Sequence, residues 1–226
     1  MDLTERVTEY YAARAPEYDE TAGYTEAAGE ALRAPIKARY REMFAGHDVL
    51  EIACGTGYWT AVIAETARSV FAFDVNPSVL AVAKDRCRGF ENVTLVVADA
   101  YAMDAVPGGF SAAFAVWWWS HVPRQRLHDF LSALHARLVP GALVLFVDQL
   151  RYDGPRRRQD AEGNTLEART LPDGRRFEIV KNFPSTEEVA EVLRDLADDV
   201  EVVERPAEKS WSVSYRTKGG RANDVA

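Results

Sequence analysis

A short glycine turn and two downstream acids are the residues best suited to hold a ligand. Gly55 and Gly57 follow the apolar run "VLEIAC", and such a turn lets a ligand approach main-chain N–H groups. Asp74 and Asp99 each end a later apolar run. If the runs are parallel strands, both acids meet the turn in one crevice at the carboxyl edge of the sheet. There Asp74 can accept both ribose hydroxyls of a nucleoside, and Asp99 can accept a hydrogen bond from an exocyclic amine.

The residues around the turn indicate which nucleoside would fit. A dinucleotide site has a third glycine where this chain has Thr60, and the bulky pair Tyr58-Trp59 stands beside it. Glu51 lies within the preceding run, where an acid would repel a pyrophosphate but suits an ammonium or sulfonium group. These residues favour S-adenosylmethionine over NAD. An NAD(P)-dependent oxidoreductase is the disfavoured alternative, and an unliganded turn is the other interpretation of the glycines.

The stretch "AVWWWSHVP", residues 115–123, is the second place where chemistry is expected. Neighbouring strand residues face opposite sides, so Trp117 and Trp119 are expected to share one face. We predict that at least one of them lines an acceptor pocket while Trp118 packs under a helix. His121 follows at the edge of the site, where it is a general-base candidate or a structural hydrogen-bonding residue. Tyr24, in the aromatic N-terminal segment, is a further predicted substrate contact.

The order of apolar runs predicts the scaffold that positions these residues. Short runs rich in β-branched residues alternate with helical patterns, which is typical of βαβ units and a parallel sheet covered on both faces. A Pro172-Asp173-Gly174 turn between two alternating runs predicts a hairpin. Ser185 and Glu188 form a capping box before an amphipathic helix. The expected strands of the main sheet are 48–53, 69–75, 92–99, 111–118, 142–149, 199–204 and 210–215, and the expected helices include 60–67, 77–88, 123–138 and 185–197.

The motifs "LEIACGTGYW", "FAFDVNPSVL", "VVADA" and "RLVPGALVLFVD" together resemble the class I S-adenosylmethionine-dependent methyltransferases. The similarity spans residues 45–150 motif by motif. More loosely, "YYAARAPEYD" resembles the cofactor-covering segment of small-molecule members, including the ubiquinone and menaquinone type. The resemblance implies a Rossmann-like, doubly wound α/β fold with a seven-stranded sheet whose last strand is antiparallel.

The resemblance also implies a role for each matched residue. It assigns the methionine end of the cofactor to Glu51, Ala53 and Gly55, the loop lining to Gly57, the ribose to Asp74, the adenine to Val75, Asp99 and the Ala100 amide, and closure over the cofactor to Tyr11 and Tyr18.

The segments divide accordingly within one expected methyltransferase domain. They are an N-terminal helical lid (1–46), a cofactor-binding core (47–150), a polar insertion with a hairpin cap (151–183), a final helix and strands (184–215) and a flexible tail (216–226).

The expected function is transfer of a methyl group from S-adenosylmethionine to oxygen or nitrogen of a small molecule, with S-adenosylhomocysteine as product. The acceptor is expected to be aromatic or amine-bearing, because aromatic residues surround its site. A non-catalytic S-adenosylmethionine-binding module is the alternative from another class.

The composition limits the classes of partner that the protein is expected to bind. A net charge of −8 argues against nucleic acid and anionic membranes as partners. The basic run 156–158 is predicted to be a solvated loop. No apolar leader or metal-ligand spacing is recognised, and two cysteines predict reduced thiols in a cytoplasmic protein without bound metal. A monomer and a homodimer are both compatible with the sequence.

Overall fold

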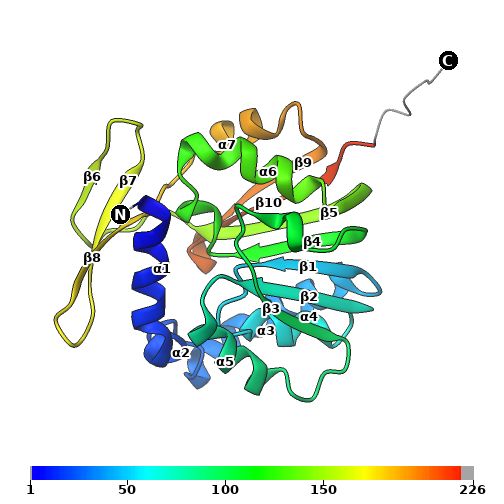
Figure 1. Ribbon diagram of the computed structural model, residues 1–226, viewed down its shortest axis with the longest axis horizontal. Helices are drawn as coiled ribbons and strands as arrows, with labels where there is room; N and C mark the ends of the chain where they lie inside the picture. The colour runs from blue at the N-terminus through cyan, green and yellow to red at the C-terminus, as the bar shows by residue number, and fades with distance from the viewer. Residues whose placement is uncertain (1, 220–226) are drawn as a thin grey trace.

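A seven-stranded sheet forms the centre of the computed structural model, which describes residues 2–219 (Figure 1). The strand order is β3-β2-β1-β4-β5-β10-β9. Only β10 runs against its neighbours, because it pairs antiparallel with both β5 and β9. The predicted Rossmann-like fold class is confirmed. The strands are β1 (Asp48–Ile52), β2 (Ser69–Asp74), β3 (Val93–Val97), β4 (Phe110–Val116), β5 (Leu138–Gln149), β9 (Ala197–Arg205) and β10 (Ser210–Thr217).

Helices cover both faces of this sheet, as its apolar strands require. On one face α6 (Leu127–His135) and α7 (Thr186–Leu193) pack against alternate strand residues such as Leu50 and Ile52. On the other, α3 (Ala27–Phe44) and α4 (Tyr58–Ala64) pack against residues such as Val49. The last helix of the layer, α5 (Pro77–Arg86), lies beside α4 (Figure 1). The carboxyl ends of the parallel strands therefore form one edge, with loops free to build a site.

A small antiparallel sheet follows β5 in the chain. It consists of β6 (Arg157–Gln159), β7 (Thr165–Thr170) and β8 (Arg176–Val180), and the predicted 172–174 turn joins its last two strands. The prediction of a solvated loop at 156–158 holds for the exposure of Arg156 and Arg158, but Arg157 and Arg158 belong to a strand rather than a loop. Arg157 belongs to β6, and its Nε lies 2.6 Å from Oε2 of the fully buried Glu167. Arg157 thus supplies the partner of a buried acid, while Arg158 pairs with the partly exposed Glu178.

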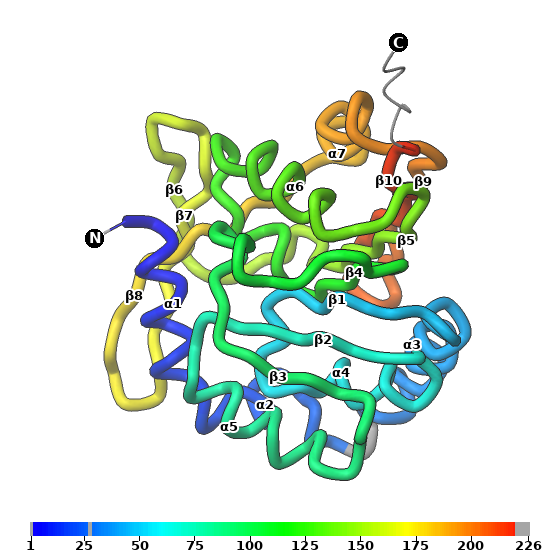
Figure 2. Tube along the Cα trace, turned by 45° about the vertical axis from the view of Figure 1, so that its right-hand side comes forward, coloured from blue at the N-terminus to red at the C-terminus, as the bar shows by residue number. Residues whose placement is uncertain are grey.

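The N-terminal helix connects the two sheets. Helix α1 (Leu3–Arg14) packs on β8, where Val7 and Tyr10 join a small apolar cluster with Ile179. In both views α1 lies between the small sheet and the main one (Figures 1 and 2). The short helix α2 (Tyr18–Thr21) follows it. Helices α1 and α2, residues 3–21, thus form a roof over the carboxyl edge of the main sheet. The small sheet on which α1 packs is distant from it in sequence.

Several predicted boundaries differ from the structure. The helix expected over 123–138 ends at His135, because β5 already begins at Leu138 and includes the Pro140-Gly141 pair. Strand β3 ends at Val97, two residues before Asp99. The capping box of Ser185 and Glu188 is confirmed. Residues 220–226 of the predicted tail lie outside the described part of the chain. Among residues 2–219, no helix has the length and apolarity needed to cross a lipid bilayer.

Candidate active site

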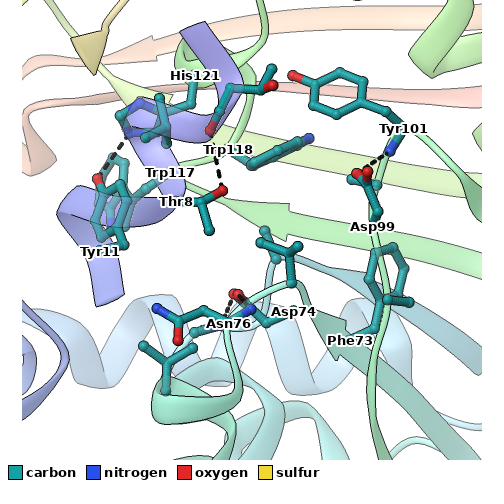
Figure 3. A pocket seen from close by; sticks show the side chains of 18 of the residues that line it. Thr8, Tyr11, Phe73, Asp74, Asn76, Asp99, Tyr101, Trp117, Trp118 and His121 are labelled. Carbon is teal, nitrogen blue, oxygen red and sulfur yellow. Dashed lines mark hydrogen bonds between the residues drawn. The ribbon is translucent and has the colours of Figure 1, made fainter. Parts of the chain in front are cut away.

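A cavity of about 470 Å³ opens at the carboxyl edge of the main sheet, under α1. Its walls come from the ends of β1, β2, β3 and β4 and from one face of α1 (Figure 3). A volume of this size accommodates a nucleoside-sized ligand together with part of a second molecule. The crevice predicted from the glycine turn and the two acids is therefore present.

The turn after β1 forms the floor. Ala53 and Gly55 both have positive φ, at 52° and 56°, and both line the cavity. No atom lies within 4 Å of the position that a Cβ on Gly55 would take, so its backbone faces open space. Gly57 does not line the cavity as expected. It begins α4, and a Cβ there would lie 2.9 Å from Ala83 of α5, so this glycine serves helix packing.

Asp74 joins the glycine turn to the end of β2. One carboxylate oxygen accepts the Gly55 N–H at 3.0 Å, and the other accepts the Asn76 N–H at 2.9 Å. Burial raises the pKa of Asp74, while these N–H groups act in the opposite direction. The two bonds fix the carboxylate at the cavity wall, and its remaining lone pairs are suited to the hydroxyls of a ribose.

The predicted adenine contacts lie on the same side of the cavity. Val75 is 42% exposed there, and Ala100 lines the wall next to Asp99. The Asp99 carboxylate accepts the Tyr101 N–H at 2.8 Å and lies at the exposed rim (Figure 3). An apolar surface beside a rim carboxylate is suited to a flat base with an amino group.

Glu51 lies behind the cavity wall. Its side chain is buried on the α4 side of β1, and burial raises its pKa to about 8. Glu51 Oε2 lacks a hydrogen-bond partner within residues 2–219, and the nearby Thr60 hydroxyl acts on the carboxyl to lower its pKa against the effect of burial. A buried carboxyl with an unused oxygen favours a positive group nearby. This local chemistry fits a ligand with an ammonium or sulfonium group, which S-adenosylmethionine carries.

At the opposite end of the cavity, Tyr11 and His121 form a pair. His121 Nδ1 lies 2.7 Å from the carbonyl oxygen of Val180, so Nδ1 carries the proton and donates it. Burial lowers the pKa of His121 well below its ordinary value, and the ring is neutral. Its Nε2 is therefore an acceptor, and the Tyr11 hydroxyl donates to it at 2.9 Å (Figure 3). Tyr18 lines the cavity beside Tyr11, with the two ring centres 6.0 Å apart.

The positions of the three adjacent tryptophans differ in part from those predicted. Trp117 has φ +60°, so β4 ends at Val116 and strand alternation no longer applies. Trp117 and Trp118 both line the cavity. As predicted, Trp118 also packs on a helix: its ring centre lies 6.0 Å from that of Phe130 in α6. Trp119 was a predicted substrate contact, and that prediction is wrong: it is 3% exposed and packs in the core between Phe146 and Trp211.

Tyr24 lies next to the cavity, with its ring centre 6.1 Å from that of Tyr18. It is not part of the cavity wall, and its ring stacks on Tyr58 of α4 with centres 3.9 Å apart and planes inclined by 6°. Gly23, with φ +71°, turns the chain after α2 so that Tyr24 packs on α4. The predicted substrate contact at Tyr24 is corrected to a packing role.

Sequence reasoning missed the part of the wall that α1 provides. Thr4, Thr8 and Tyr11 line the cavity together with Glu5, at the spacings of one helical face. Tyr101 and Asn76 were missed as well, on the sheet side. The helical spacing of Thr4, Thr8 and Tyr11 was a usable signal, because it places a polar stripe on a helix with little apolar character.

Positive charge gathers behind the Tyr11–His121 end. Lys181 is 2% exposed, and its Nζ lies 2.8 Å from Ser120 Oγ and 3.2 Å from Asp148 Oδ1. Arg169 pairs with Glu167 at 2.6 Å. After burial, the charges of Lys181, Arg169 and Arg14 are the further causes that lower the pKa of His121. These charges therefore oppose protonation of His121, although Lys181 and Arg169 are each paired with an acid.

Comparison with known proteins agrees with this geometry. A family model described as a methyltransferase domain matches residues 49–141. The solved complex of DhpI with SAM and HEP is 33% identical, with a TM-score of 0.77, and the alignment covers 95% of this chain and 97% of that one. The DhpI–SAH complex is 34% identical with a TM-score of 0.74, covering 97% and 98%.

A curated relative gives a shorter match. The demethylmenaquinone methyltransferase of Staphylococcus epidermidis is 30% identical over 109 residues, which are 46% of this chain and 43% of the relative. The chain thus spans less than half the length of this relative, whereas it covers DhpI almost end to end. With the seven-stranded fold and the cavity at its carboxyl edge, these matches show that the chain belongs to the class I S-adenosylmethionine-dependent methyltransferases.

Proposed function

We propose that this protein transfers the methyl group of S-adenosylmethionine to an oxygen atom of a small-molecule acceptor. The observation that carries the proposal is the division of one cavity into two ends. The Gly55–Asp74 end offers carboxylate and backbone groups for a nucleoside, and the other end offers aromatic rings and the Tyr11–His121 pair.

At the first end, the sheet residues keep the cofactor roles expected from the motifs, whereas Tyr11 and Tyr18, which were expected to close over the cofactor, are assigned to the acceptor end. Asp74 holds the ribose, Val75 and Ala100 flank the adenine, and Asp99 accepts from its amino group. Ala53 and Gly55 hold the methionine end, with Glu51 behind them. When bound, the cofactor supplies an electrophilic methyl group, and the protein contributes orientation and exclusion of water. Gly57 supports this end indirectly by packing α4 on α5.

The acceptor end determines how the oxygen is prepared. A histidine whose pKa lies well below 6.5 is a poor proton acceptor, and its Nε2 is already occupied by the Tyr11 hydroxyl. We therefore assign His121 an orienting role, in which it fixes the Tyr11 hydroxyl at the cavity wall. The general-base role considered from the sequence is not needed if the acceptor arrives with an acidic oxygen.

Charge favours oxygen over nitrogen as the methylated atom. Lys181, Arg169 and Arg14 oppose a cation beside His121, which favours an ionised oxygen over an ammonium group at that ring. Glu5 and Glu9 also line the cavity, so this preference applies to the His121 end alone. Tyr18 and Trp117 line this end and carry an O–H and an N–H that can donate to such an oxygen. The insertion contributes by holding His121 through the Val180 carbonyl.

A labelling experiment tests the proposal. The protein is incubated with S-adenosylmethionine carrying a 13C-methyl group and with fractions of a small-molecule extract separated by charge. We expect label in the anionic and phenolic fractions, attached to oxygen when the product is analysed by NMR. Label on nitrogen would overturn the choice of oxygen. Cofactor binding without transfer to any fraction would favour the non-catalytic alternative.

A further inference from the structure

Asp19 lies in the roof segment immediately after Tyr18, but it does not line the cavity. It points to the glycine turn instead. Its Oδ1 accepts a hydrogen bond from Thr56 Oγ1 at 2.6 Å, and its Oδ2 pairs with the guanidinium of Arg86. Thr56 is the residue between Gly55 and Gly57 and is only 2% exposed. Asp19 of the roof therefore contacts the middle residue of the loop that is predicted to bind the cofactor.

Arg86, near the end of α5, closes a ring of contacts. Its Nη1 donates to the Thr56 carbonyl at 2.5 Å and to Thr56 Oγ1 at 3.0 Å. The side chains of Arg86 and Asp19 are 26% and 21% exposed, so water screens their charges only in part. Hydrogen bonds between charged groups in such surroundings are stronger than those of exposed ion pairs. Three segments, α2, the glycine turn and α5, thus meet at one threonine.

The position of Thr56 links this ring to the cavity. Its neighbour Gly55 lines the cavity and donates its N–H to Asp74. Helix α1 covers one side of the same cavity, and the rim at Val75 and Asp99 is exposed. The roof therefore forms one side of the opening through which a nucleoside-sized ligand can leave. Any roof movement that carries α2 away must break the contacts of Asp19 with Thr56 and Arg86.

We propose that Asp19 and Arg86 are positioning residues for the cofactor. Through Thr56 they tie the roof to the glycine turn, and this tie slows the release of the cofactor and of its demethylated product. The inference rests on the proposed use of S-adenosylmethionine, but it does not depend on which atom is methylated.

The roof has a second attachment, so loss of the first need not unfold it. Arg33 of α3 donates to the Gly23 carbonyl at 2.7 Å and to the Tyr58 hydroxyl at 2.9 Å. Tyr24 stacks on the same Tyr58. Because these contacts hold the chain after α2, we expect Asp19→Ala to loosen the tie while the fold persists.

The test is the dissociation rate of S-adenosylhomocysteine, followed in stopped flow by the fluorescence of the cavity tryptophans. We expect Asp19→Ala and Arg86→Ala each to speed release about tenfold, since each removes a charge-assisted contact. The double variant should be no faster than either single one, because both act through the same ring. Asp19→Asn keeps an oxygen for Thr56 and should give an intermediate rate.

Asp85→Asn is the matched control. It lies on the same helix and removes an exposed pair with Arg88, so release should be unchanged. In the ligand-free protein, Asp19→Ala should also speed trypsin cleavage after Arg14. Release rates of both single variants within about twofold of the unmodified protein, or effects that add in the double variant, would overturn the proposal. Failure of the unmodified protein to bind S-adenosylhomocysteine would instead refute the use of this cofactor.

Discussion

The two ends of the cavity are built in different ways. The Gly55–Asp74 end comes from consecutive βα units, and its groups lie within one stretch of about fifty residues, from β1 to the turn after β3. The Tyr11–His121 end brings together α1, the turn after β4 and the carboxyl end of β8. The first end is a local product of the fold, and the second depends on long-range packing. This difference explains why the spacing of Gly55, Asp74 and Asp99 predicted one shared crevice, whereas the contact of Tyr11 with His121 could not be predicted.

The largest expected effect is at the first end. Asp74→Ala removes the carboxylate that accepts the Gly55 and Asn76 N–H groups and is assigned to the ribose. We expect the affinity for S-adenosylhomocysteine to fall about 100-fold in calorimetry, the loss of roughly two charge-assisted hydrogen bonds. Asp74→Asn keeps one oxygen acceptor, so its affinity for S-adenosylhomocysteine should fall less. An Asp74→Ala protein with unchanged affinity would remove Asp74 from the cofactor site.

Trp117 tests the other end. Trp117→Ala removes an aromatic wall, and we expect kcat/KM for the acceptor to fall about 30-fold while the affinity for S-adenosylhomocysteine changes little. Trp119→Phe is the contrasting variant, because Trp119 lies in the core. It should lower the melting temperature and leave kcat/KM of the folded enzyme unchanged. The opposite pattern would mean that Trp119, not Trp117, faces the acceptor.

Tyr11→Phe removes the hydroxyl that donates to His121 Nε2 and leaves that nitrogen buried without its partner. We expect kcat/KM to fall about tenfold, corresponding to the loss of one buried hydrogen bond. Binding of S-adenosylhomocysteine should weaken less than the acceptor kinetics. If the cofactor affinity fell as much as kcat/KM, Tyr11 would belong mainly to the cofactor end.

Glu51 should make cofactor binding depend on pH. Its pKa is raised to about 8 by burial, so the carboxyl is protonated at pH 7 and must lose its proton to pair with a cation. Affinity for S-adenosylmethionine should therefore rise about fivefold between pH 7 and pH 8. We expect Glu51→Gln to flatten that rise, after allowance for titration of the cofactor's own amino group in a ligand-only control. An equal rise in Glu51→Gln would exclude Glu51 as the cause.

The same group affects stability with a definite sign. A carboxyl whose pKa is raised in the folded state stabilises the fold at low pH, and that contribution is lost as the pH rises towards about 8. Urea unfolding at acidic and mildly alkaline pH should show a smaller decline in Glu51→Gln than in the unmodified protein.

The smallest expected effect concerns His121. Because burial holds its pKa well below the ordinary value, no change of kcat/KM around pH 6.5 should come from protonation of the ring. The pH profile of the unmodified enzyme checks this. A limb near pH 6.5 that disappears in His121→Gln would restore the general-base role and contradict the orienting role.

Much of the fold followed from the order of apolar runs, and even the hairpin at 172–174 was recognised from its turn residues. The errors have physical causes. Strand alternation predicted that Trp117 and Trp119 share a face, but the positive φ of Trp117 ended the strand and placed Trp119 in the core. Arg157 looked as solvated as its neighbours because its partner, Glu167, belongs to another strand.

The roof was the least predictable part of the site. Tyr11 and Tyr18 were recognised only through the family resemblance, and the contact of Tyr11 with His121 joins residues 110 positions apart. Nothing local in the sequence encodes such a meeting. It depends on α1 packing against β8, and β8 belongs to an insertion whose three strands pair only with one another.

Hydrogen exchange with and without S-adenosylhomocysteine tests the division of the cavity most directly. We expect this ligand alone to protect the backbone of residues 53–57, 74–76 and 99–101 and the roof above them, while residues 180–182 of the insertion change little. Equal protection of residues 180–182, or none at 53–57, would contradict the assignment of the Gly55–Asp74 end to the cofactor and the Tyr11–His121 end to the acceptor.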